Sequence, residues 1–218
     1  MIRILFRSLT IATVLTALAA FAASAQDARV STRLDARTAA AVTRVVDSAR
    51  SRSLPTEPLV QKALQGAAKR APSARVLAAV SELLGELSTA RSALGQRSTE
   101  AELVAGAGAL HAGVPEATLS RIRELRGGQS VTVAVGTLAD LVARGVPVDA
   151  AVSAILALVE RRAADGDVIA FSNQVGRDIA AGAPPAVAAR VRARGPGARP
   201  AIVPGRPDNA GRGRPPAE

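Results

Sequence analysis

Residues 138–160 read LADLVARGVPVDAAVSAILALVE. Two segments with apolar residues at helical spacing are separated only by Gly145, Val146 and Pro147. Glycine takes the left-handed conformation that ends a helix at little cost, and valine can then fold back onto the last turn at Leu141. The residue before a proline is pushed into extended geometry, whereas proline itself suits the first turn of a helix. The stretch therefore predicts two helices joined by a very short turn, which must be close neighbours in space.

The same joint recurs along the chain. It is found again at residues 111–115 (HAGVP) and 180–184 (AAGAP), with a weaker copy lacking glycine at 52–55 (RSLP). The prolines at 115, 147 and 184 are 32 and 37 residues apart, a separation typical of two-helix repeats. The tetratricopeptide and ankyrin signatures are both missing. Two explanations stay open, degenerate internal repeats and ordinary helix punctuation.

Helical periodicity covers most of the remaining chain. A five-residue alternation from Val131 to Val135 also fits a strand, but it fits a helix equally well, and a lone strand would have no partner. We therefore predict an all-α fold, an array of short antiparallel helix hairpins with an Ala/Val/Leu core. The helices are expected at 31–52, 55–69, 72–95, 98–113, 115–127, 130–144, 147–160, 165–180 and 184–194.

Aromatic residues contribute almost nothing to this core. The chain has no tryptophan or tyrosine, and beyond the first 25 residues its only phenylalanine is Phe171. Aromatic side chains each bury about 150–250 Å², so a core of small aliphatic residues buries less area at each contact. There is also no cysteine, hence no disulfide to compensate. We expect modest stability.

The two ends differ in composition from residues 26–194, which we predict to form the helical domain. Residues 1–25 combine Arg3 and Arg7, an apolar run and the small residues Ala-Ser-Ala, which predicts a secretory signal peptide cut near Ala25. The apolar run is shorter than the roughly 20 residues of a membrane-spanning helix, which favours cleavage over anchoring. Residues 195–218 are rich in Gly, Pro and Arg without periodicity, which predicts a disordered tail. The mature protein is expected in a bacterial periplasm or outside the cell, without a transmembrane span.

Reactive residue types are scarce. The single histidine, His111, is expected in the last turn of its helix, where it can bond free carbonyls or favour the helix dipole. Glu82 and Glu86 lie one turn apart, but Arg75 and Arg91 flank them, which indicates a solvated face of mixed charge. A zinc site normally needs at least three His, Cys or acidic ligands, and no sequence cluster supplies them. We predict no catalytic residue, no metal ligand and no cofactor.

Two further patterns have structural explanations. Asp165-Gly166-Asp167 begins like a calcium loop but lacks the later acidic ligands, so helix capping explains it better. Gly106 and Gly108 lack the preceding strand and the third glycine of a dinucleotide-binding fingerprint. Close packing of helices is the better account of both glycines. An enzyme with an unrecognised acid-based site is the least favoured of three functional hypotheses.

The formal net charge of +10 reflects 28 basic residues against 18 acidic ones, and only two of the basic residues are lysine. A basic surface favours anionic partners at low salt, although a GC-rich genome would also give this composition. Nucleic acid is disfavoured because Phe171 is the only aromatic residue left for stacking and because the chain is expected to be exported. The leading hypothesis is a non-enzymatic scaffold or interaction module of the cell envelope, whose partner is another envelope protein or an anionic envelope polymer. The alternative is a protein that binds acidic glycan or lipopolysaccharide through Arg121, Arg123, Arg126, Arg161 and Arg162.

Overall fold

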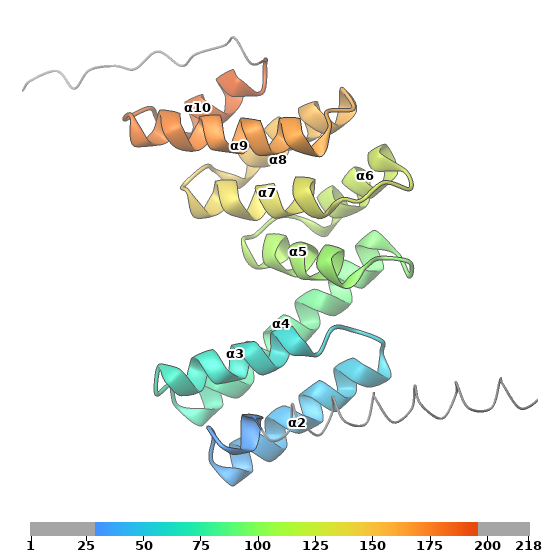
Figure 1. Ribbon diagram of the computed structural model, residues 1–218, viewed down its shortest axis with the longest axis vertical. Coiled ribbons are helices and arrows are strands. Elements are labelled where there is room, and N and C mark those ends of the chain that lie inside the picture. Colours follow the sequence, from blue (N-terminus) through green and yellow to red (C-terminus); the bar gives the residue numbers. More distant parts are fainter. Residues whose placement is uncertain (1–28, 196–218) are drawn as a thin grey trace, which may run out of the picture. The chain divides into compact units, whose positions relative to one another are not determined.

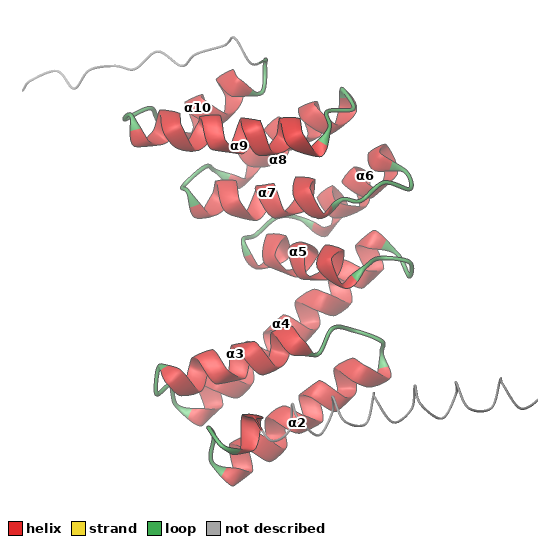
Figure 2. Ribbon diagram, in the orientation of Figure 1, coloured by secondary structure: helices red, strands yellow, loops and turns green. Residues whose placement is uncertain are grey.

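The computed structural model describes residues 29–195, and every regular element in this range is a helix (Figures 1 and 2). The all-α prediction is confirmed. The predicted signal peptide and residues 196–218 of the predicted tail lie outside the described residues. The helices are α2 (Ala36–Ser51), α3 (Glu57–Ala68), α4 (Ser73–Leu94), α5 (Glu100–His111), α6 (Glu116–Arg126), α7 (Thr132–Ala143), α8 (Val148–Glu160), α9 (Asp165–Ala180) and α10 (Pro185–Arg192).

The chain divides into two compact units, and the boundary between Gly136 and Thr137 falls inside α7. In the first unit the long helix α4 contacts α2, α3, α5 and α6. Its buried apolar residues recur at helical spacing, as the sequence predicted: Val76, Val80, Leu87 and Leu94. Helix α4 is therefore the element around which the first unit packs.

Alanine and glycine let α5 approach α4 closely. A Cβ atom added to Gly106 would lie 2.8 Å from the Cβ of Ala90 and 3.3 Å from Cδ1 of Leu94. A methyl group does not fit there, so close helix packing explains Gly106. At Gly108 an added Cβ would meet no atom within 4 Å. The same explanation for Gly108 is therefore wrong.

In the second unit α10 packs against both α8 and α9. The single aromatic side chain of this unit, Phe171 on α9, is 4% exposed. Polar contacts also connect the helices of this unit. Ser172 donates a hydrogen bond of 2.8 Å to Asp140 of α7, and Arg192 pairs with Asp178 through two hydrogen bonds of 2.6 and 2.7 Å.

The joint at Gly145 has the expected geometry. Gly145 has a φ of 85°, its N–H donates to the carbonyl of Val142, and the N–H of Val146 donates to the carbonyl of Leu141 at 3.0 Å. These two bonds define a Schellman cap, and Val146 and Leu141 are both buried. The same bond pattern closes the helices at Gly113 and Gly182. The helix-ending part of the predicted joint is confirmed at all three glycines.

Three more joints use residues other than glycine. The residues at these joints are Ser53, Arg70 and Arg162, with φ values of 54°, 51° and 58°. At each joint, the N–H of this residue and the N–H of the next residue donate to carbonyls of the preceding helix in the same Schellman pattern. Sequence reasoning found only the weak copy at residue 53. The helix ends near residues 70 and 162 were predicted, but the left-handed joints there were missed because arginine rarely takes this conformation.

Three local predictions need correction. Pro115, Pro147 and Pro184 occupy the N-cap position rather than the first turn, and their carbonyls accept the first hydrogen bonds of α6, α8 and α10. Helix α5, expected to start at residue 98, begins at Glu100 and is capped by Thr99. The helical periodicity of residues 98–113 would place Val104 on the inner face of α5, but Val104 is 41% exposed.

Candidate functional sites

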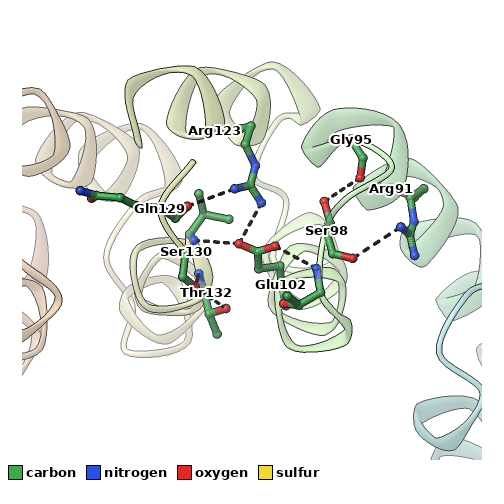
Figure 3. Close-up of polar contacts among 10 residues, drawn as sticks. Arg91, Gly95, Ser98, Glu102, Arg123, Gln129, Ser130 and Thr132 are labelled. Carbon is green, nitrogen blue, oxygen red and sulfur yellow. Dashed lines mark hydrogen bonds and ion pairs between the residues drawn. The ribbon is translucent and has the colours of Figure 1, made fainter. Parts of the chain in front are cut away.

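The most deeply buried charge in the described residues belongs to Glu102, which is 4% exposed (Figure 3). Its Oε2 accepts a hydrogen bond of 2.9 Å from the N–H of Thr99, the other half of a capping box. Its Oε1 accepts one of 3.1 Å from the N–H of Val131, which precedes α7. The guanidinium of Arg123, on α6, lies 2.9 Å from the same oxygen. One carboxylate thereby joins α5, α6 and the start of α7.

These contacts decide the ionisation of Glu102. Burial alone would raise the pKa of the carboxyl, but the backbone N–H groups of Thr99 and Val131, with Arg123, outweigh burial and hold the pKa below its usual value. The group is thus a fixed anion with both oxygens occupied. Such a carboxylate is suited to holding helices in register and not to exchanging protons with a substrate.

A groove of about 560 Å³ lies in the second unit between α8 and α10. Small side chains line much of it, and charged side chains are almost all basic. The lining residues include Ala150, Ala154, Ala157, Ala186 and Ala193, with Arg161, Arg190, Arg194 and Asp149. Arg161 donates a hydrogen bond of 2.7 Å to the carbonyl of Ala193, which fixes its side chain across one end. The groove is therefore apolar with an excess of positive charge.

The five arginines proposed from sequence as polyanion contacts have different surroundings. Arg121 is exposed and 3.3 Å from Glu124, while Arg123 is held by Glu102. Arg126 is half-buried at the end of α6, and Arg162 is exposed at a joint. Arg161 alone lines the groove. There it meets Arg190 and Arg194, which sequence reasoning did not single out because they become its neighbours only through the packing of α10 on α8.

The two glutamates of α4 and the single histidine come together in the first unit. Nδ1 of His111 lies 2.8 Å from Oε1 of Glu86, and one ligand atom from each of Glu82, Glu86 and His111 lies within 4.8 Å of the others. Arg91 donates instead to the carbonyls of Ser53 and Gln96. From the sequence, Glu82 and Glu86 were expected beside arginines, and His111 near free carbonyls. The contact between Glu86 and His111 was missed because only tertiary packing brings these two residues together.

Comparison with known proteins gives no relative from which to infer a function. Scans against protein-family models, curated proteins and solved structures found no match to this chain. Among residues 29–195, no helix is both long and apolar enough to cross a lipid bilayer.

Proposed function

We propose that the protein is an exported, non-enzymatic interaction module of the bacterial cell envelope. In this proposal it binds an acidic, amphipathic helix of a partner protein in the groove between α8 and α10. The observation that carries the proposal is the composition of the groove, with an alanine floor and three arginines against one aspartate. The predicted signal peptide supports the envelope location.

The floor of the groove favours a helical partner. Alanine side chains leave a shallow apolar surface on which the apolar face of an amphipathic helix can lie, as in other helix-in-groove complexes. The guanidinium group of arginine matches a carboxylate geometrically and can bind it through two hydrogen bonds. An acidic amphipathic helix can cover the apolar floor with its apolar face and pair its carboxylates with the arginines. An acidic glycan would contact the arginines but leave the apolar floor uncovered.

The arginines at positions 190, 192 and 194 are available for this role to different degrees. Arg192 is committed to Asp178 on α9. Arg190 and Arg194 are exposed, and residues 185–194 contain no acidic side chain. Exposed charges contribute mainly to the rate and specificity of association, so binding should weaken as salt screens them.

Site-specific photocrosslinking in the native cells tests the proposal. A photoreactive amino acid replaces Ser153, which lines the groove, and in a matched control it replaces Asn173, which is exposed on α9 outside the groove. We expect a crosslink to one partner protein from position 153 and none from 173. Mass spectrometry should place it in an acidic amphipathic segment. In the double variant Arg190→Glu/Arg194→Glu the crosslink should disappear.

Binding of a synthetic peptide with the crosslinked sequence, followed by fluorescence anisotropy, then gives the affinity and its salt dependence. A crosslink to lipopolysaccharide or glycan would replace the proposal with the polyanion alternative. Equal crosslinking from positions 153 and 173, or a signal that survives the charge reversal, would remove the groove as the binding surface. Recovery of the mature protein from the cytoplasm alone would contradict the envelope location.

A further inference from the structure

We propose that Glu82, Glu86 and His111 form a binding site for a divalent transition-metal ion, with Zn²⁺ as the favoured occupant. Two carboxylates one turn apart on α4 face an imidazole from the last turn of α5, and their ligand atoms lie within 4.8 Å of one another. The site is independent of the α8–α10 groove, which belongs to the other unit. It contradicts our own expectation from sequence that the chain holds no metal ligand.

The donor set distinguishes this cluster from an ordinary acidic patch. Calcium and magnesium prefer oxygen ligands alone, whereas imidazole with carboxylates suits zinc and its neighbours. Catalytic zinc sites commonly use three protein ligands and leave a fourth position to water. Two carboxylates and one neutral imidazole also carry a charge of −2, which a divalent cation neutralises. The chemistry of the cluster therefore fits zinc better than a hard cation.

The packing of α4 against α5 places the ligands before any ion binds. Because Gly106 lies against Ala90, the two helices are held close and His111 is brought to Glu86. Zinc bonds of about 2.0–2.2 Å to N and O put neighbouring ligand atoms of a tetrahedron about 3.4 Å apart. The 2.8 Å between Nδ1 and Oε1 must widen slightly, and the 57% exposed side chain of His111 is free to move that far. Zinc binding would replace the direct contact between these two atoms.

The surroundings leave space and charge for an ion. Like charges one turn apart on a helix repel each other, and a bound cation would relieve the repulsion between Glu82 and Glu86. The side chain of His111 is 57% exposed, and Glu82 is also exposed. Water molecules that complete the coordination of a metal can therefore reach the site.

The single histidine makes the test unusually specific. Untagged protein, freed of metal with a chelator, has one imidazole, so the ring-nitrogen NMR spectrum has one pair of ¹⁵N resonances. On addition of ZnCl₂ we expect a large shift of the Nδ1 resonance that saturates at one ion per chain. Calorimetry with Zn²⁺ should give the same stoichiometry, and Mg²⁺ at the same concentration should leave the spectrum unchanged.

Variants assign the three ligands. Glu82→Gln, Glu86→Gln and His111→Ala should each weaken Zn²⁺ binding by at least about tenfold, since even outer partners of metal ligands contribute 10- to 100-fold. Glu124→Gln, an exposed acid on α6 with the same change of charge, should bind like wild type. Circular dichroism checks that each variant is folded. Wild-type affinity in His111→Ala, an unshifted imidazole at saturation, or one ion per two chains would each overturn the intrachain site.

Discussion

Glu102 and Arg123 are an ion pair of 2.9 Å in which the glutamate side chain is 5% and the arginine side chain 22% exposed. The carboxylate also accepts hydrogen bonds from the N–H groups of Thr99 and Val131, which directly precede α5 and α7. A fully satisfied buried carboxylate constrains helix packing more than apolar contacts do, because each of its hydrogen bonds requires a specific geometry. We conclude that this residue fixes the register of α5, α6 and the start of α7.

Removal of the carboxylate should therefore be costly. We expect Glu102→Ala to lower the free energy of unfolding by about 2–3 kcal/mol, because two N–H groups and a guanidinium lose their acceptor. The matched control is Glu100→Ala, an exposed acid two residues away on the same helix, with an expected loss below about 1 kcal/mol. Urea denaturation measures both. Equal losses in the two variants would show that Glu102 has no special role.

The ionisation of Glu102 predicts how stability depends on pH. Its pKa in the folded protein is lowered from an ordinary value of 4.5, so its ionised form favours the folded state above pH 4.5. This contribution disappears as the pH falls through the folded-state pKa. We expect wild type and Glu102→Gln to differ in stability at pH 7, and the difference to shrink as the pH falls below 4.5 and through the folded-state pKa. Urea titrations at several pH values measure the difference, and a constant gap would contradict the assignment.

Much of the fold follows from the sequence because helix ends have local causes. Gly113, Gly145 and Gly182 mark three joints, and the periodicity between them defines the helices. Arg70 and Arg162 take the same left-handed conformation, although arginine does not signal it in a sequence. At these two positions the Schellman hydrogen bonds and the docking of the next helix must offset the unfavourable φ. No local pattern reports that compensation.

Gly145 and Arg162 both have a positive φ, so we expect substitutions at these two positions to change stability in opposite directions. Gly145→Ala should destabilise the protein by about 1 kcal/mol, because alanine is strained at a φ of 85°. Arg162→Gly should instead raise stability by up to about 1 kcal/mol, since glycine takes the φ of 58° without strain. Thermal unfolding of both variants measures the effect. A loss of stability in Arg162→Gly would mean that its side chain makes a compensating contact.

The candidate sites were harder to predict than the fold. Local spacing shows that Glu82 and Glu86 share a helix face, but His111 reaches them only after α5 has docked on α4. Arg161 and Arg190 likewise become neighbours through the packing of α10 on α8. Each site combines residues more than twenty positions apart, and one sequence contains no signal for that pairing.

Two glycines on α5 provide a matched test of the packing that positions His111. At Gly106 an added methyl group would lie 2.8 Å from the Cβ of Ala90, which cannot rotate away. Gly106→Ala should therefore push α5 from α4, lower stability by about 1–3 kcal/mol and separate His111 from Glu86. At Gly108 the methyl group has open space, so Gly108→Ala should raise stability by about 0.5–1 kcal/mol through helix propensity. Urea denaturation gives the stabilities, and the ring-nitrogen NMR resonances of His111 report its contact with Glu86. Similar behaviour of the two variants would contradict the close approach of α5 and α4.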